Sequence, residues 1–241
     1  MIFASLQFSD HAKTQRSITT LRFFDNKESF SAAAPSQCMT IEDFETSKEF
    51  PSSGIINCGN TVSSYTVNAC YDTGDLVNGF SYSARSSLHR GENANVFAFS
   101  AGTGGVDFAT SFIGANQTEA ITDIVFTGDI DTFAVGFDVR SFTAKDIGIN
   151  IYGDSKYGFT SLVQDLVISP SGPGEGRFFV LVSTTRIQRV RMLGGSVPMT
   201  HNLQFGNPYP CLNKNKKNKS NKKNKRNKKS SRKKTSNLDN K

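Results

Sequence analysis

Carboxylates gather in two short stretches of the sequence. "IEDFE" carries Glu42, Asp43 and Glu45, and "TGDIDTF" carries Asp129 and Asp131. Calcium in proteins binds several oxygen ligands, including carboxylates and backbone carbonyls that loops often supply. Asp43 and Glu45 are therefore candidate ligands of a structural calcium ion, with a backbone carbonyl of the last strand beside them. The second stretch lacks D-x-D-x-D-G spacing and indicates a hairpin turn. No other cofactor is expected.

Tyrosines supply the candidate ligand-binding side chains. An aromatic ring packs on the apolar face of a sugar, and binding sites combine such contacts with a few placed polar groups. The candidates lie in Ser/Asn-rich segments or flank a turn, and they are Tyr65, Tyr71, Tyr82, Tyr152 and Tyr157. The alternative is that these rings close loops and leave their hydroxyls in water. The sequence has no tryptophan, which weakens the sugar-binding pattern.

Cations dominate the last stretch of the sequence, residues 214–234. They are Lys214, Lys216, Lys217, Lys219, Lys222, Lys223, Lys225, Arg226, Lys228, Lys229, Arg232, Lys233 and Lys234. Dense cations release counterions from any polyanion, so RNA, DNA, acidic polysaccharide, anionic lipid and mineral surfaces are candidate partners. No aromatic residues interleave to stack bases. The same composition suits a nuclear or nucleolar address, or a solvated extension without a function.

The charge of the chain is divided unequally. The whole sequence carries 28 basic and 21 acidic residues, yet residues 213–241 hold 14 of the basic residues and one acidic residue. The remainder is therefore mildly acidic. Such asymmetry indicates a folded domain with an interaction tail. The tail has almost no apolar side chains to bury against the entropy of ordering, so it is predicted to be disordered.

Four cysteines are present. Cys58 and Cys70 bracket the polar segment "CGNTVSSYTVNAC", and their spacing alone leaves a disulfide and two free thiols equally open. Cys38 is expected to pack as a small apolar residue beside Met39, while Cys211 lies where the tail begins. The spacings contain no C-x-x-C and no histidine at ligand distance, so zinc is not expected.

The sequence gives little support for a catalytic function. The sequence lacks the nucleophile elbow, the P-loop, the zinc-protease helix motif and the dinucleotide fingerprint. His11, His89 and His201 are scattered, so a triad would need the fold to gather one of them beside a serine and an aspartate. Paired carboxylates for glycoside hydrolysis would need a cleft of definite width. We expect a protein that is not an enzyme, with a hydrolase as the least favoured alternative.

Strand patterns dominate the elements that must position these residues. One short helix is predicted within residues 25–35, capped by Asp25 or Asn26 and ended by Pro35. Alternating apolar residues and turn signals predict ten to twelve strands. The expected strands span residues 18–24, 39–45, 78–84, 95–100, 105–110, 121–128, 131–139, 147–153, 177–183, 185–193 and 199–206. Alternation with few helices predicts an all-β fold, an antiparallel β-sandwich or jelly roll.

Three regions follow from these patterns. Residues 1–17 are a loose leader, 18–207 the β-sandwich domain and 208–241 the disordered Lys/Asn-rich tail. No apolar run is long enough for a membrane helix. The first residues are not a convincing signal peptide, because their apolar stretch is short and follows no basic segment.

Several stretches together resemble bacterial extracellular domains of the kind found in PEP-CTERM sorting-domain proteins. They are "FFDNKESFSAAAPSQCMTIEDFE", "NACYDTGDLVNGFSYSA", "DTFAVGFDVRSF" and "THNLQFG", in matching order from residue 20 to residue 206. The resemblance implies a jelly-roll-like sandwich that is secreted or displayed at the cell surface. It also implies that Cys58 pairs with Cys70. The family's sorting signal is not present, and His201 stands where an aspartate is usual, which puts an edge calcium site in doubt.

Two functions therefore lead. The first is a non-catalytic, extracellular-type β-sandwich that binds carbohydrate or another surface ligand. The second is a polyanion-interaction protein that acts through its tail. The extracellular location implied by the resemblance competes with the nuclear or nucleolar location that the tail suggests, and the oligomeric state is left open.

Overall fold

A computed structural model describes the chain from residue 21 to residue 211 with short gaps. The gaps are residues 25, 46–47, 52, 87–93, 104–109, 116, 118–119, 129, 142, 144, 156–157, 170–175 and 195–196, and the side chains of 154–155, 158–161 and 163–165 are also not described. The expected leader and the cations from Lys214 onward therefore lie outside the described residues.

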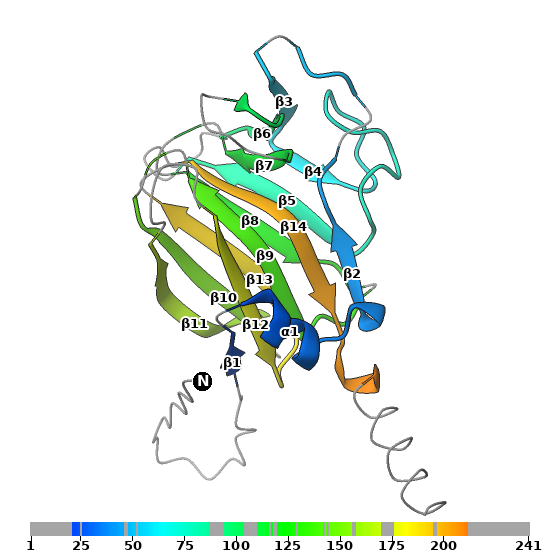
Figure 1. Ribbon diagram of the computed structural model, residues 1–241, viewed down its shortest axis with the longest axis vertical. Helices are drawn as coiled ribbons and strands as arrows, with labels where there is room; N and C mark the ends of the chain where they lie inside the picture. The colour runs from blue at the N-terminus through cyan, green and yellow to red at the C-terminus, as the bar shows by residue number, and fades with distance from the viewer. Residues whose placement is uncertain are drawn as a thin grey trace, which may run out of the picture.

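The described residues form two antiparallel sheets packed as a sandwich (Figure 1), which confirms the predicted fold class. The larger sheet has the order β1 (Leu21–Phe23), β12 (Arg177–Ser183), β9 (Ala134–Ser141), β14 (Pro198–Gly206), β7 (Phe112–Ala115), β6 (Val96–Phe99) and β3 (Ile55–Gly59), with β2 (Met39–Glu42) also paired to β14. The smaller sheet has the order β11 (Gly158–Ile168), β10 (Ile147–Ser155), β13 (Ile187–Gly194), β8 (Ile121–Phe126), β5 (Phe80–Arg85) and β4 (Thr61–Ser63).

Alternation along the strands decides which side chains enter the core. Val135, Phe137 and Val139 of β9 are fully buried, as are Ile149 and Ile151 of β10 in the facing sheet. Burying each such side chain stabilises the fold by about 1.5–3 kcal/mol. The period-two pattern that predicted these strands is therefore the pattern that forms the interior.

The expected strand set differs from the observed one at four strands. Strands β3, β4, β7 and β11 were not predicted, because their segments show no sustained alternation of apolar and polar residues. The strand expected at residues 105–110 lies almost wholly outside the described residues, and β7 follows it at Phe112.

The predicted helix is present as α1 (Lys27–Ala33). Asn26 caps it by accepting a hydrogen bond of 2.8 Å from the backbone N–H of Ser29. Phe30 is fully buried and packs beside Gly136 and Phe178 on the outer face of the larger sheet. The helix therefore covers the β9 and β12 part of that sheet at the lower end of Figure 1.

Cys38 is not the free, apolar side chain that the sequence indicated. It forms a disulfide with Cys211, 173 residues away, and no described cysteine is free. Strand β2 pairs with the end of β14 through Met39 and Gly206, which brings the 3-10 helix η1 (Ser36–Cys38) beside the chain that follows β14. The two partners meet because of this pairing, which no local sequence pattern reports.

The folded body also extends past the predicted boundary at residue 207. Tyr209 packs edge-to-face against Phe133, with ring centroids 5.8 Å apart, and its hydroxyl donates a 2.8 Å hydrogen bond to the carbonyl of Ser183. Together with the Cys38–Cys211 disulfide, these contacts hold the chain to the sandwich as far as residue 211.

Candidate functional site

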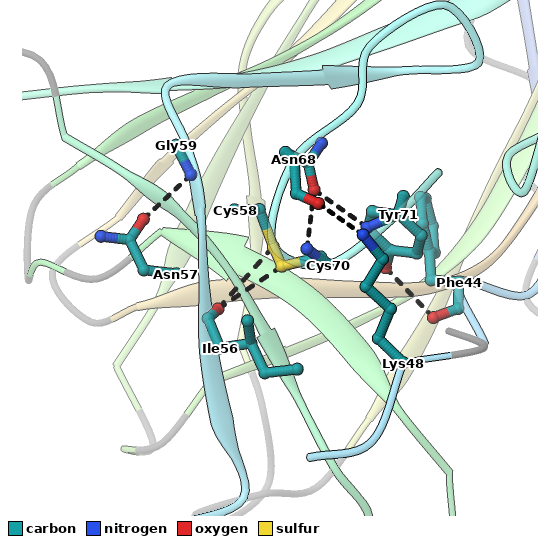
Figure 2. Close-up of a disulfide and its surroundings, with 9 residues drawn as sticks. All are labelled: Phe44, Lys48, Ile56, Asn57, Cys58, Gly59, Asn68, Cys70 and Tyr71. Atoms are coloured by element: carbon teal, nitrogen blue, oxygen red, sulfur yellow. Dashed lines mark hydrogen bonds between the residues drawn. A yellow bond between two sulfur atoms is a disulfide. The ribbon is translucent and has the colours of Figure 1, made fainter. Parts of the chain in front are cut away.

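The loop between β4 and β5, residues 64–79, is the candidate binding site. It leaves the smaller sheet at the end of the sandwich where β3 and β4 lie (Figure 1). A disulfide joins Cys58 of β3 to Cys70 of the loop, the pair that the family resemblance implied (Figure 2). Both cysteines are buried, and the buried Cys70 is part of the main hydrophobic core. The loop is therefore fastened covalently to a strand of the other sheet.

An Asx turn shapes the loop next to this disulfide. The side-chain oxygen of Asn68 accepts hydrogen bonds from the backbone N–H groups of Cys70, at 2.8 Å, and Tyr71, at 2.9 Å. The N–H of Asn68 donates to the carbonyl of Tyr71 at 3.0 Å. Asparagine favours such turns because its side chain replaces a backbone acceptor. The turn thus sets the direction of the chain on both sides of Cys70.

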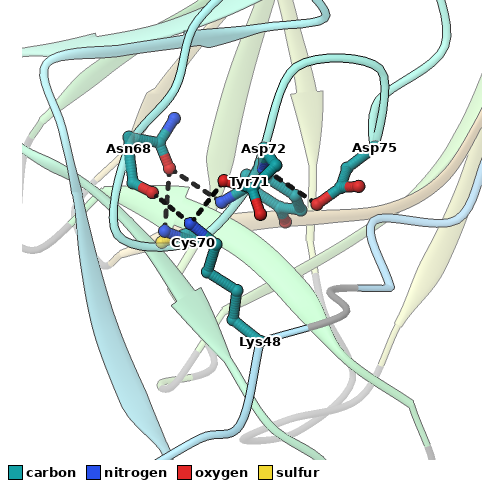
Figure 3. Close-up of polar contacts among 6 residues, drawn as sticks. All are labelled: Lys48, Asn68, Cys70, Tyr71, Asp72 and Asp75. Carbon is teal, nitrogen blue, oxygen red and sulfur yellow. Dashed lines mark hydrogen bonds and ion pairs between the residues drawn. The ribbon is translucent and has the colours of Figure 1, made fainter.

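Lys48 ties the loop to the segment that follows β2. Its ammonium group donates to the carbonyl of Asn68 at 2.8 Å and pairs with the Asp72 carboxylate at 3.0 Å (Figure 3). Asp75 accepts a 2.8 Å hydrogen bond from the N–H of Asp72. Because Asp72 is mostly exposed, the ion pair itself contributes no more than about 1 kcal/mol. The backbone contact to Asn68 is the more specific part of this tie.

Tyr71 anchors the loop to the core of the sandwich. Its side chain is fully buried, and its hydroxyl donates a 3.2 Å hydrogen bond to the carbonyl of Phe44 (Figure 2). Burial raises the pKa of Tyr71 well above its ordinary value, and the neighbouring carboxylates of Glu42 and Glu45 raise it further. The hydroxyl therefore stays protonated and remains a donor. Tyr71 is a structural residue of the loop, not the ligand-binding residue that was predicted.

Glu42 holds the far end of the same loop. One carboxylate oxygen accepts a 2.7 Å hydrogen bond from the N–H of Phe44, and the other accepts a 2.8 Å hydrogen bond from the N–H of Val77. Burial raises the pKa of Glu42, although these two N–H groups act in the opposite direction. Phe44 adopts a left-handed backbone with φ of 58°, a conformation that costs a non-glycine residue about 1–3 kcal/mol. Glu42 stabilises this turn directly.

Tyr65 and Val67 project from the secured loop into solvent. Their side chains are 66% and 69% exposed, more than any other large apolar residue that the structure describes. Ser63 and Thr66 brace the turn beneath them, since Thr66 Oγ1 donates to the Ser63 carbonyl at 3.0 Å and accepts from its N–H at 2.9 Å. The site thus presents an aromatic ring and an aliphatic side chain on a fixed backbone.

The five predicted ligand-binding tyrosines do not lie together in the structure. Tyr82 is fully buried, so its prediction is wrong for the same reason as that of Tyr71, and burial raises its pKa to about 12. Tyr152 lies on β10 of the smaller sheet, away from the loop, and Tyr157 falls outside the described residues. Tyr65 alone of the five lies exposed on the loop. Alternation on β5 could have placed Tyr82 inside, beside Phe80.

The predicted calcium ligands lie at the base of the same region. Asp43 accepts a 3.1 Å hydrogen bond from the N–H of Glu45, and Glu45 accepts a 3.0 Å hydrogen bond from the hydroxyl of Ser111. A carboxylate offers about four acceptor positions, so both keep lone pairs for a cation. Within the part of the chain that the structure describes, no three His, Cys, Asp or Glu side chains are grouped to hold a metal. Calcium binding stays a prediction.

Of the other chemistry-bearing residues named from the sequence, the structure describes Asp131 and His201, which make their contacts with residues outside this loop. Asp131 pairs with Arg186 at 3.6 Å, and Asp129 is not described. His201 contacts the ring of Phe112, with centroids 5.6 Å apart. His11 and His89 lie outside the described residues.

Sequence reasoning missed several residues of the site, among them Val67, Asn68 and Lys48. Asn68 had a usable signal, because asparagine two positions before a cysteine favours an Asx turn. Lys48 had none, since its partners lie 20 and 24 positions away.

No protein-family model and no curated protein matches this sequence. Among solved structures, the chain is similar to a cleaved adhesin domain of Lys-gingipain, at 10% identity over 71% of this chain and 99% of that one, with a TM-score of 0.39. It is also similar to a family 29 carbohydrate-binding module, at 12% identity over 69% of this chain and 88% of that one, with a TM-score of 0.31.

A third similar structure is the enzymatically active domain of tailspike protein 4 from bacteriophage CBA120. It is 11% identical over 54% of this chain and 19% of that one, with a TM-score of 0.31. Scores this low carry no argument about ligand or activity. The protein is, by its own structure, a disulfide-bonded antiparallel β-sandwich. No helix among the described residues is long and apolar enough to cross a membrane.

Proposed function

We propose that this protein is a non-catalytic β-sandwich that binds carbohydrate through Tyr65 on the disulfide-closed loop. The observation that carries the proposal is the 66% exposure of Tyr65 on a loop that a disulfide, an Asx turn, Lys48 and Tyr71 all hold in place. An exposed aromatic side chain on a mobile loop would lose much of its binding energy to ordering. Here the loop is already ordered by contacts that involve no ligand.

The chemistry of the loop suits a sugar. A tyrosine ring is rigid, with two torsions, and offers an apolar face together with a hydroxyl. Val67 adds apolar surface beside it, and the exposed carboxylate of Asp72 lies on the same loop as a hydrogen-bond acceptor. This combination of an apolar platform and few polar groups is typical of a small binding site.

The disulfides support an extracellular or cell-surface location for the proposed function. Disulfides persist in oxidising compartments and are rare in the cytosol and nucleus. Two of them join four cysteines, which leaves no free thiol among the described residues. This pairing favours the location that the resemblance to PEP-CTERM domains implies over the nuclear or nucleolar alternative.

A glycan array probed with the full chain, followed by calorimetry on the strongest neutral glycan, tests the proposal. Tyr65→Ala should weaken binding about tenfold or more, because a central aromatic anchor carries much of the binding energy. Val167→Ala is the matched control, since Val167 is an exposed apolar residue, 55% exposed, on β11 at the opposite end of the smaller sheet from β4 and the loop. The proposal fails if no neutral glycan binds, or if both variants bind as the wild type does.

Calcium is proposed to support the base of this site through Asp43 and Glu45. These two residues flank Phe44, whose carbonyl accepts the hydrogen bond from the Tyr71 hydroxyl, and Lys48 follows in the same segment. Added calcium should raise the melting temperature of the wild type, because a ligand that binds only the folded state stabilises it. Glu45→Gln should abolish that rise. An equal rise in both proteins, or none in the wild type, would refute this role.

A second candidate function is polyanion binding by the tail, favoured by its 14 basic residues among positions 213–241. Removal of residues 213–241 should abolish binding to RNA or heparin and leave the fold unchanged. Retained binding after removal would contradict it.

A further inference from the structure

A row of charged and aromatic side chains crosses the outer face of the smaller sheet. Arg85 of β5, Asp123 of β8, Arg191 of β13 and Tyr152 of β10 lie on four strands that are neighbours in that sheet. Their sequence neighbours Ala84, Ile124, Val190 and Ile151 point into the core, so the row faces outward. The helix α1 packs on the other sheet and so does not cover this face.

Arg191 and Asp123 form a fixed pair at the centre of the row. Arg191 Nε donates to Asp123 Oδ1 at 2.8 Å, and Arg191 Nη2 donates to Asp123 Oδ2 at 3.1 Å. This bidentate geometry is the strongest that an arginine and a carboxylate adopt. The side chains are 18% and 12% exposed, so the pair is largely removed from water. The opposite charges of the two side chains cancel, and Arg191 fixes the position of the Asp123 carboxylate.

Arg85 adds a second guanidinium to the same carboxylate. Its Nε lies 3.9 Å from Asp123 Oδ2, too far for a hydrogen bond, and its side chain is 49% exposed. Asp123 already accepts two hydrogen bonds from Arg191, so one carboxylate serves two arginines. The three side chains therefore carry one excess positive charge, and the donors of Arg85 are left toward solvent.

Two hydroxyl side chains lie near Arg85 on the same face, Ser83 two positions earlier on β5 and Thr61 on the neighbouring strand β4. Ser83 lies opposite Asp123 on one side and opposite Thr61 of β4 on the other. At the other end of the row, the guanidinium of Arg191 lies 5.4 Å from the centre of the Tyr152 ring. An exposed cation thus lies at one end of the row with two hydroxyls nearby, and an aromatic ring lies at the other end.

We propose that this row is a second binding site, for an acidic polysaccharide, with Arg85 as the residue that binds the carboxylate or sulfate group. Arginine's planar donors match both anions in a bidentate manner. The neighbouring hydroxyls of Ser83 and Thr61 suit the uncharged hydroxyls of a sugar. Asp123 holds Arg85 by charge attraction without consuming its donors. This site is separate from the Tyr65 loop and does not depend on it.

Binding of the full chain to dextran, dextran sulfate and polygalacturonate at constant ionic strength tests the proposal. Arg85→Gln should weaken binding to the sulfate or the carboxylate polymer about tenfold, the loss expected for one charge-assisted contact. Whichever polymer loses affinity identifies the anion. Arg22→Gln is the matched control, because Arg22 is an exposed cation on β1 of the other sheet and its removal changes the charge equally. It should change binding less than twofold.

Nuclear magnetic resonance separates this site from the basic tail. Tri-galacturonate added to the labelled full chain should shift the backbone amide signals of Ser83, Asp123 and Arg191. Shifts confined to residues 213–241, or equal losses for Arg85→Gln and Arg22→Gln, would overturn the proposal. Tyr65→Ala should leave acidic polysaccharide binding unchanged, so failure of this site and failure of the Tyr65 site give different results.

Discussion

The two disulfides lie in different parts of the molecule and do different work. Cys58–Cys70 spans 12 residues, is buried and fastens one loop, whereas Cys38–Cys211 spans 173 residues, is only partly buried and joins η1, just before β2, to the segment after β14. On the loop-entropy model, the first stabilises the fold by about 3 kcal/mol and the second by about 5 kcal/mol. The long bridge joins segments near the two ends of the described chain, and the short one holds the loop of the proposed binding site.

Removal of the long bridge should have the largest effect on stability. The double variant Cys38→Ser with Cys211→Ser should lose about 3–5 kcal/mol of the free energy of unfolding, measured by urea denaturation. Any variant protein that remains folded should keep its affinity for the ligand of the Tyr65 loop. An unchanged denaturation midpoint would show that the β2–β14 pairing holds this part of the body without the bridge.

Removal of the short bridge should have a smaller effect on stability and a larger effect on binding. The double variant Cys58→Ser with Cys70→Ser should lose about 2–3 kcal/mol of stability. Its affinity for a neutral glycan should fall, because Tyr65 would then sit on a looser loop. Calorimetry on both double variants compares them directly. If the long-bridge variant lost more affinity than this one, the division of roles would be wrong.

Glu42 should make the loop region sensitive to pH. Burial raises the pKa of Glu42 in the folded state above its usual value of 4.5, so the folded protein holds this proton more tightly. The contribution of Glu42 is therefore fully present below pH 4.5 and is lost as the pH rises through the folded-state pKa. The difference in unfolding free energy between wild type and Glu42→Gln should thus fall from acidic to neutral pH.

Glu42→Gln should also cost about 1–2 kcal/mol at acidic pH, because one of the N–H groups of Phe44 and Val77 would then face an amide nitrogen, which cannot accept a hydrogen bond as the carboxyl hydroxyl can. Chemical denaturation of both proteins between pH 4 and pH 7 measures both effects. Parallel stability curves across this range would contradict the assigned pH dependence.

Lys48→Met should have the smallest effect. The ion pair to Asp72 is exposed and worth no more than about 1 kcal/mol. The lost hydrogen bond to the carbonyl of Asn68 should nevertheless raise hydrogen exchange in the loop around Asn68 more than elsewhere. Uniform exchange in the variant and the wild type would show that Lys48 does not order the loop.

Sequence patterns predicted the parts of this molecule that depend on nearest neighbours. The alternation of Val135, Phe137 and Val139 predicted β9 and its buried face, and Asn26 predicted the start of α1. Patterns predicted less about the site. Tyr65 and Tyr71 could not be told apart from the sequence, because a tyrosine suits either a core or a surface, whereas alternation with Phe80 could have placed Tyr82 in the core. The resemblance to a known kind of domain implied the Cys58–Cys70 disulfide, but it did not identify the residues that hold the loop around that disulfide.

The sequence by itself determined an all-β sandwich with one short helix, a mildly acidic body and a basic tail, because side-chain alternation and charge are local properties. Only the tertiary structure decided that Cys38 meets Cys211, that Tyr65 alone of the five tyrosines lies exposed on the loop, and that Arg85 joins Asp123 and Arg191. The physical reason is strand order. Alternation states which face a residue occupies, but the order of strands in each sheet states which residues share that face.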